Sequence, residues 1–101
     1  KTEEILIRGL PLGGLKNETF DIQKRDFKKG DVLVMLSDGL PEAENSSGEL
    51  YDYDRVLSLI TKNSKKSSEE IRDKLISEVD RWLDGGIPDD DVTIVVIKKN
   101  T

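Results

Sequence analysis

The sequence contains neither cysteine nor histidine among its 101 residues. The absence of cysteine excludes disulfide bonds, thiolate zinc sites and cysteine nucleophiles. The absence of histidine excludes a histidine-based catalytic triad and a histidine-ligated metal within this chain. Carboxylates, hydroxyls, lysines and arginines remain for chemistry, and catalysis with that set usually means carboxylate acid–base work or a hard metal ion bound by oxygen.

Aromatic residues and long apolar runs are also scarce. At 5% aromatic content the chain offers no stacking platform for single-stranded nucleic acid. The small basic cluster at 62–66 reads as a solvated loop before a helix, on a chain of net charge -5. No run approaches the roughly 20 apolar residues of a membrane span, and three of residues 1–4 are charged, which is unlike a signal peptide. We therefore expect no nucleic-acid partner, no membrane association of this segment and a cytoplasmic location.

What the sequence does contain is a pattern of short strands and two amphipathic helices. The strands are predicted at 3–8, 18–27, 32–36 and 92–97, and the valine-rich run at 32–36 is expected to be buried on both faces. A first helix is predicted at 52–60. A second helix begins at a capping box of Ser67 with Glu70, carries apolar residues at helical spacing and stops at the glycine pair 85–86.

This order of elements predicts an α+β fold, with an antiparallel β-sheet and both helices on one of its faces. The length allows one domain or a piece of one. The strands at 32–36 and 92–97 leave few polar side chains for the other sheet face. We therefore expect a missing second layer, and self-association of the chain through the exposed sheet face.

Two acidic turns lie at the ends of the most apolar strands. Asp38 follows the strand at 32–36, and the aspartate run 89–91 precedes the strand at 92–97. If these strands are antiparallel neighbours, Asp38 and the run converge. Carboxylates brought together repel one another unless a cation compensates. Mg²⁺ or Mn²⁺ suits such oxygen ligands, and two ions of this kind can orient a phosphoryl group for attack.

The same residues allow a simpler interpretation. Asp-Gly is a common turn dipeptide, and three aspartates after a proline also form a solvated turn. Gly39 fits the metal hypothesis because glycine lets backbone approach a ligand. Ser37 is a weak candidate for a nucleophile because no base accompanies it.

Four motifs together carry a family resemblance. They are GLPLG at 9–13, KGDVLVMLSDGLPEAEN at 29–45, GE at 48–49 and DDVTIVV at 90–96. In order and spacing they resemble the PP2C-like metal-dependent protein serine/threonine phosphatases of the SpoIIE and RsbU type. The resemblance covers essentially the whole chain. It identifies residues 1–101 as the C-terminal part of a single phosphatase domain.

The resemblance implies a portion of an α-β-β-α sandwich that dephosphorylates a phosphoserine or phosphothreonine protein in bacterial signalling. An anti-sigma-factor antagonist is the kind of substrate implied. It implies Mn²⁺ or Mg²⁺ held by Asp38 and Asp90, with metal-bound water as the nucleophile and no covalently modified side chain. Asp91 would orient the turn, and Gly39 would be the position of close backbone approach.

The chain departs from the family pattern in two places. The acidic motifs of the family's N-terminal half are not matched here, so the two-metal site is incompletely encoded and the fragment is expected to be inactive alone. Tyr51-Asp52 stands where the family has an aromatic-glycine pair, which leaves the shape of that turn open.

Two further functions compete with the phosphatase hypothesis. The helices and the loop at 41–54 would form a non-catalytic protein-interaction module if the aspartates were ordinary turn residues. A structural domain with bound Ca²⁺ is disfavoured because no loop has the alternating ligand pattern of an EF-hand.

Overall fold

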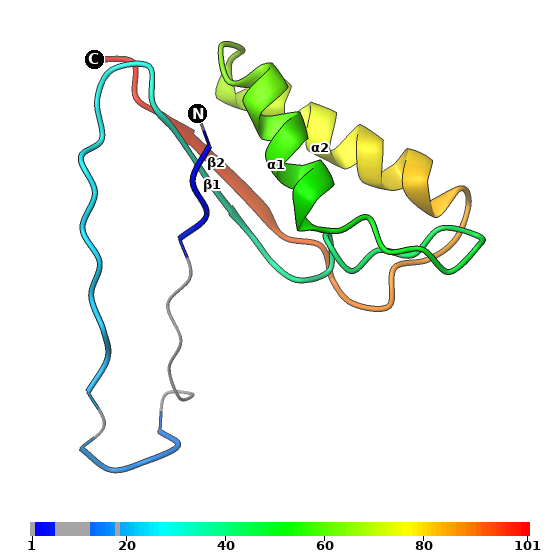
Figure 1. Cartoon of the computed structure of the whole chain (residues 1–101), viewed down its shortest axis with the longest axis horizontal. Helices are drawn as coiled ribbons and strands as arrows, with labels where there is room; N and C mark the ends of the chain where they lie inside the picture. The colour runs from blue at the N-terminus through cyan, green and yellow to red at the C-terminus, as the bar shows by residue number, and fades with distance from the viewer. Residues whose placement is uncertain (1, 6–12, 18) are drawn as a thin grey trace.

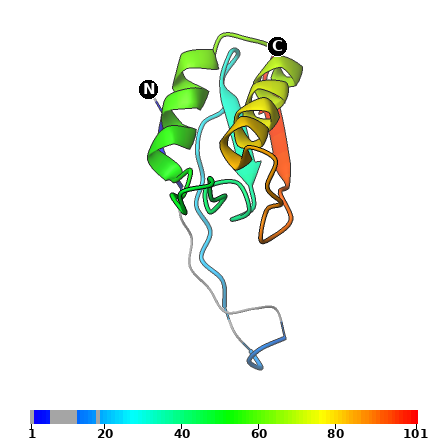
Figure 2. The ribbon, with the colours of Figure 1, turned by 90° about the vertical axis from the view of Figure 1, so that its right-hand side faces the viewer.

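The computed structural model describes residues 2–5, 13–17 and 19–101. Its regular elements are β1 (Val32–Leu36), α1 (Tyr53–Asn63), α2 (Ser68–Leu83) and β2 (Ile94–Lys98), in that order (Figure 1). Both helices lie on the same face of the sheet (Figure 2). The predicted α+β class, with an antiparallel sheet and two helices on one face, is confirmed.

Within the described ranges the sheet has two antiparallel strands from opposite ends of the element order. Leu36 pairs with Ile94, and Val32 pairs with Lys98. Side chains alternate between the faces because successive residues of a strand point to opposite sides. Val34 and Val96 thus pack toward the helices and the core.

The core lies between the sheet and the helices. The loop that follows β1 is also part of the core, since Leu40 is 1% exposed and Ala43 is 2% exposed. The remaining buried apolar residues come from the loop before α1 and from the two helices, namely Tyr51, Val56, Ile71, Leu75, Val79 and Leu83. Burial of Leu40 and Ala43 anchors the segment that carries Asp38 to the core.

The predicted capping box of α2 is confirmed. The Glu70 amide donates to Ser67 Oγ at 3.2 Å, and the Ser67 amide donates to Glu70 Oε1 at 3.2 Å. The helix ends at Asp84, in a left-handed conformation with φ 48°, followed by Gly85 at φ 84°. Asp84 therefore serves as the C-cap directly before the predicted glycine stop.

Helix α1 extends one turn beyond its predicted end. Its last turn contains polar residues that read as a connection, but their side chains bond back to the helix. Thr61 Oγ1 donates to the Leu57 carbonyl at 2.8 Å, and Asn63 Nδ2 donates to the Leu59 carbonyl at 2.7 Å.

In the described part of the chain, no helix is long and apolar enough to cross a bilayer.

The strand predicted at 18–27 is wrong over its described residues. Residues 19–28 carry no regular secondary structure and run away from the body of the protein (Figure 1). Ile22 is 80% exposed. A strand needs a neighbouring backbone for its hydrogen bonds, and none of the residues that the structure describes forms a ladder with this segment.

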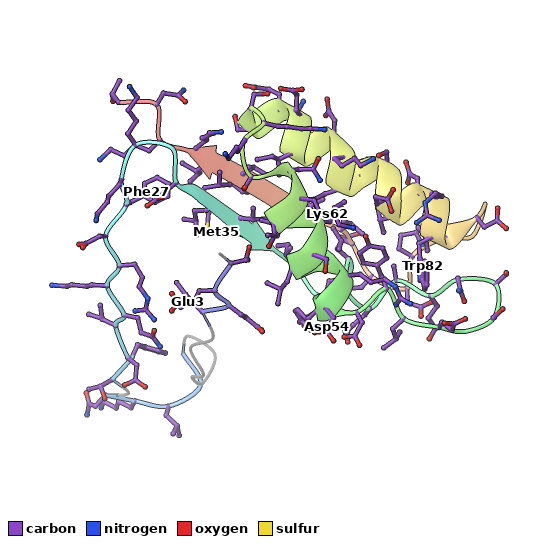
Figure 3. All side chains as sticks on the ribbon, turned by 45° about the horizontal axis from the view of Figure 1, so that its top comes forward. Glu3, Phe27, Met35, Asp54, Lys62 and Trp82 are labelled. Carbon is purple, nitrogen blue, oxygen red and sulfur yellow. The ribbon has the colours of Figure 1, made fainter. Side chains whose placement is uncertain are left out.

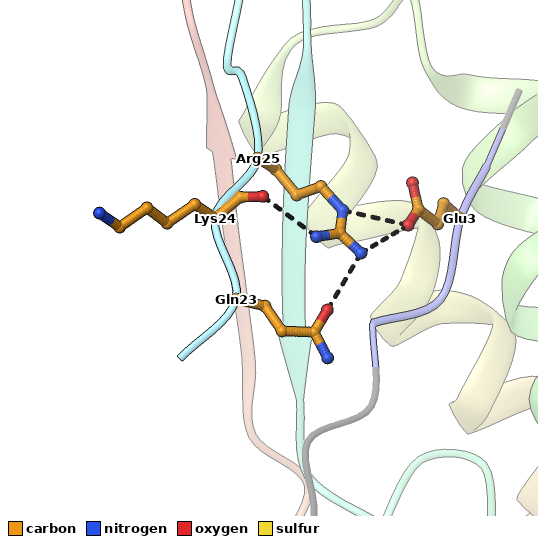
Figure 4. Close-up of polar contacts among 4 residues, drawn as sticks. All are labelled: Glu3, Gln23, Lys24 and Arg25. Carbon is orange, nitrogen blue, oxygen red and sulfur yellow. Dashed lines mark hydrogen bonds and ion pairs between the residues drawn. The ribbon is translucent and has the colours of Figure 1, made fainter. Parts of the chain in front are cut away.

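The N-terminal strand is likewise not formed at 2–5, and the rest of that predicted strand lies outside the described residues. Side chains still link this segment to the extended one. Arg25 forms an ion pair with Glu3 at 2.9 Å and also contacts Gln23 and the Lys24 carbonyl (Figure 4). Both charged groups are exposed, and such pairs add little stability.

The sheet face turned away from the helices is apolar and exposed. We call it the open sheet face; it consists of two cross-strand pairs, Leu33 with Ile97 and Met35 with Val95. Met35 is seen on this side in Figure 3 and is 48% exposed. The expected burial of β1 on both faces is therefore wrong for this structure, because one face has no covering layer among the described residues.

We expect Met35→Lys to weaken self-association of the chain, because a charge on the open sheet face disfavours burying it against a second copy. Sedimentation velocity over a concentration series would measure this. Ile76→Lys is the matched control, since Ile76 is 43% exposed on α2. A monomeric wild-type chain, or equal effects of both variants, would contradict the role of the open sheet face.

The capping box gives a prediction about acid stability. Hydrogen bonds from the Ser67 backbone and hydroxyl lower the pKa of Glu70 below 4.5. A carboxylate with a lowered folded-state pKa stabilises the fold above its unfolded-state pKa, and that contribution is lost as the pH falls through the folded-state pKa. Glu70→Gln keeps an acceptor for the box and should flatten the decline of the unfolding midpoint below about pH 4.5.

Glu69→Gln is the control for charge alone, because it lies in the same helical turn without forming the box. Thermal unfolding monitored by circular dichroism between neutral and acid pH would compare the variants. Equal acid sensitivity of Glu70→Gln and the wild type would contradict this account.

Candidate metal centre

The ends of β1 and β2 are joined by the hydroxyl of Ser37. Ser37 Oγ donates to the Asp91 carbonyl at 3.0 Å and accepts from the Thr93 amide at 2.9 Å. The Ser37 amide also donates to the Thr93 carbonyl at 3.0 Å. These bonds continue the sheet pairing beyond Leu36 and fix the acidic turn beside the end of β1. They also give Ser37 a structural role in place of a nucleophilic one.

Gly39 makes the approach between the two turns possible. A Cβ atom at this position would lie 2.8 Å from the carbonyl carbon of Asp91 and 3.0 Å from the carbonyl oxygen of Asp90. The sequence suggested that Gly39 lets backbone approach a ligand. In the structure, the group that approaches it is the backbone of the acidic turn.

Asp38 is an exposed carboxylate that accepts a hydrogen bond from a helix residue. Tyr53 Oη, at the start of α1, donates to Asp38 Oδ1 at 3.0 Å. This bond is the largest cause that raises the pKa of the Tyr53 phenol above its ordinary value of 10.0, followed by burial and by the negative charges of Asp38, Glu42 and Glu4. The sequence alone did not assign Tyr53 to the site, because nothing in the local pattern shows that α1 begins beside Asp38.

Asp90 is exposed and borders a shallow hollow of about 200 Å³. Its Oδ1 accepts from the Asp91 amide at 2.8 Å. The other residues that line the hollow are Gly39, Glu42, Glu44, Leu50 and Asp89. Glu42 and Glu44 were not predicted as part of the site, although both lie within the motif at 29–45.

The donor chemistry of this region suits a hard cation. Asp38 and Asp90 are exposed carboxylates on two turns whose backbones touch, and Mg²⁺ is often bound through one or two carboxylates with water in the other positions. In residues 2–5, 13–17 and 19–101, no three acidic side chains gather closely enough to hold an ion together. The assignment of Asp38, Asp90 and the supporting Asp91 as a metal site stays a prediction.

The turn before α1 adopts the shape that glycine would favour, with aspartate in its place. Asp52 has φ 73° and ψ 159°, a region populated essentially by glycine that costs about 1–3 kcal/mol for other residues. The Asp52 amide donates to the Pro41 carbonyl at 2.7 Å, and Asp52 Oδ1 accepts from the Tyr53 amide at 2.7 Å. These bonds hold the strained residue and settle the shape of the turn that the sequence left open.

Aromatic packing secures the same loop from the other side. The rings of Tyr51 and Trp82 meet edge to face at 5.5 Å, and the Arg55 guanidinium lies 4.4 Å from the Trp82 ring centre. Trp82 Nε1 donates to the Glu49 carbonyl at 3.0 Å, and Arg55 Nη1 donates to the Leu50 carbonyl at 3.0 Å. The start of α1, with Tyr53, is thus held by α2 as well as by the loop after β1.

Gly39→Ala should destabilise the fold by about 2–3 kcal/mol, because the added methyl group meets backbone that cannot rotate away. Gly86→Ala is the matched control, since its Cβ would have one tight contact, with the Leu83 carbonyl oxygen at 3.0 Å. Urea unfolding of both variants would give the difference. A Gly39→Ala variant as stable as wild type would show that the turns do not meet in this way.

Comparison with known protein families gives a match along almost the whole chain. Residues 1–100 match the model of the stage II sporulation protein E (SpoIIE) family. Protein IcfG of Synechocystis sp. is 28% identical over 92 residues, which cover 91% of this chain and 14% of IcfG. Stage II sporulation protein E of Bacillus subtilis is 32% identical over 90 residues, which cover 88% of this chain and 10% of that protein.

No solved structure matches the chain at a significant level. The chain spans 14% or less of the length of these two relatives. Similarity over so small a share concerns this segment and does not transfer the activities of whole proteins.

Proposed function

Since the chain belongs to the stage II sporulation protein E family, a PP2C-like phosphatase family, we propose that it contributes part of a metal-dependent protein serine/threonine phosphatase site. The reaction would be hydrolysis of a phosphomonoester on a bacterial regulatory protein. The observation that carries the proposal is the joining of two acidic turns through Ser37 and Gly39 at one end of the sheet.

Asp38 and Asp90 would hold Mn²⁺ or Mg²⁺ at this end of the sheet. Such ions, when bound, lower the pKa of a water molecule and orient a phosphoryl group for in-line attack. Further ligands for a two-metal site would come from other parts of a longer phosphatase domain. The chain alone is expected to lack phosphatase activity, since it offers two of the required carboxylates.

The residues of this chain would contribute by holding the two acidic segments in place. Gly39 admits the backbone of the acidic turn, and Ser37 binds the Asp91 carbonyl, so the two segments bearing Asp38 and Asp90 keep a fixed relation. Asp91 would orient the turn through that carbonyl. The backbone that carries Asp38 is anchored, because the Glu42 amide donates to the Asp38 backbone carbonyl at 3.0 Å and Leu40 is buried.

The proposed substrate is a phosphoserine or phosphothreonine protein in the cytoplasm, of the anti-sigma-factor-antagonist kind. The open sheet face would be covered by another layer of the complete domain, or by a second copy of the isolated chain. The hydrophobic character of Leu33, Met35, Val95 and Ile97 supports this part of the proposal.

We expect the chain to bind Mn²⁺ weakly and Asp38→Asn and Asp90→Asn to abolish the binding, because each change removes an anionic oxygen ligand. Isothermal titration calorimetry with MnCl₂ would measure it. Asp80→Asn is the charge-matched control, since Asp80 is exposed on α2. Binding that survives in either site variant would count against the role of that residue, and equal losses in all three variants would indicate a general charge effect.

Hydrolysis of a generic aryl phosphate by this chain should be absent or very low with Mn²⁺ present. Robust turnover would mean that two carboxylates suffice. A chain that binds a protein partner independently of Mn²⁺, and tolerates both aspartate substitutions, would favour a non-catalytic interaction module.

A further inference from the structure

We propose that Tyr53 is a positioning residue that holds the Asp38 carboxylate in the orientation required for metal binding. The inference rests on the proposed function, because it gives Asp38 its role as a ligand. It adds a residue that the motif pattern does not assign, from a different element of the fold. The main observation behind it is the 3.0 Å hydrogen bond from Tyr53 Oη to Asp38 Oδ1.

This hydrogen bond restricts a side chain that is otherwise exposed to solvent. Asp38 follows β1, and its exposed carboxylate would sample several rotamers without a partner. A carboxylate that accepts the Tyr53 hydroxyl on Oδ1 retains its second oxygen as an acceptor toward a cation. Groups that hydrogen-bond to metal ligands in this way fix the orientation of the ligand and commonly contribute to metal affinity.

Tyr53 is itself held firmly at its backbone. It is the first residue of α1, and its amide donates to Asp52 Oδ1 at 2.7 Å. The Asp52 amide reaches the Pro41 carbonyl at 2.7 Å, and the Tyr51 amide reaches the Ala43 carbonyl at 2.8 Å. The helix start is therefore fastened to the loop that begins with Asp38.

The strained conformation of Asp52 is consistent with a constraint on the direction of α1. At φ 73° and ψ 159°, Asp52 occupies backbone space that residues with a side chain rarely adopt. A helix that started with relaxed backbone at this residue would leave the loop in another direction. The observed geometry sends the Tyr53 ring toward Asp38.

If Tyr53 only packed in the core, its side chain would be buried. Tyr53 is 40% exposed, whereas Tyr51 is 3% exposed in the core. The hydroxyl of Tyr53 is therefore not required to fill space. Tyr53→Phe keeps the ring and removes the donor, and Tyr51→Phe removes the other tyrosine hydroxyl of the chain as a matched control.

The first experiment measures Mn²⁺ binding to the wild-type chain, Tyr53→Phe, Tyr51→Phe and Asp38→Asn by isothermal titration calorimetry. We expect Tyr53→Phe to weaken binding about tenfold, and Tyr51→Phe to leave it unchanged. The double variant Tyr53→Phe/Asp38→Asn should bind no worse than Asp38→Asn alone, because Tyr53 acts through Asp38. Thermal unfolding of each variant would show that the fold is retained.

The second experiment needs no metal. In the metal-free chain, the Asp38 carboxylate ¹³C resonance should shift in Tyr53→Phe and stay in place in Tyr51→Phe, because the loss of a donor changes the electronic environment of the carboxylate. An unmoved resonance would overturn the proposal at its first step.

The outcomes separate the two proposals. If the wild-type chain binds Mn²⁺ and Asp38→Asn abolishes the binding while Tyr53→Phe does not change it, the role of Tyr53 is overturned and the metal site stands. If the wild-type chain binds no Mn²⁺, the metal site and the role of Tyr53 are both overturned.

Discussion

The arrangement of this protein depends on the hydroxyl of Ser37. It donates to one backbone group of the acidic turn and accepts from another, at 3.0 and 2.9 Å. A hydroxyl can act in both directions because it carries one donor hydrogen and two lone pairs. Alanine at this position would leave backbone groups of the turn without these partners. The relation between the two acidic segments follows from this one side chain and from the missing side chain of Gly39.

Local sequence signals predicted the elements whose stability is local. The apolar spacing of α2 and its Ser67–Glu70 capping box depend on residues three and four positions apart, so the sequence contains the whole interaction. The strong β propensity of β1 and β2 identified both strands. Their apolar character predicted an uncovered sheet face, although the burial of β1 on both faces that it also predicted is not observed. For residues 19–28, the same kind of local signal predicted a strand that the structure does not contain. Their partial alternation satisfies a strand pattern, but pairing requires a second backbone that the pattern does not specify.

In the candidate site, too, part of the arrangement could be predicted from the sequence and part depends on tertiary contacts. The aspartates at 38 and 90 stand out in the sequence because each one lies in an acidic turn at the end of an apolar strand, and the meeting of the strand ends follows from antiparallel pairing. Tyr53 could not be found in this way. Its position beside Asp38 depends on the glycine-like backbone of Asp52, which propensities for aspartate disfavour, and on packing of Trp82 against Tyr51 and Arg55. Tertiary contacts overrode a local preference there.

The pairing of β1 with β2 has a consequence for the order of folding. The two strands flank both helices in the chain, so their ladder closes a long loop and forms only after β2, which is synthesised later than both helices. The helical pair can become ordered earlier, since its contacts are between neighbours in sequence. The acidic turns would therefore be brought together in the same step that completes the core, when β2 pairs with β1 beneath the helices.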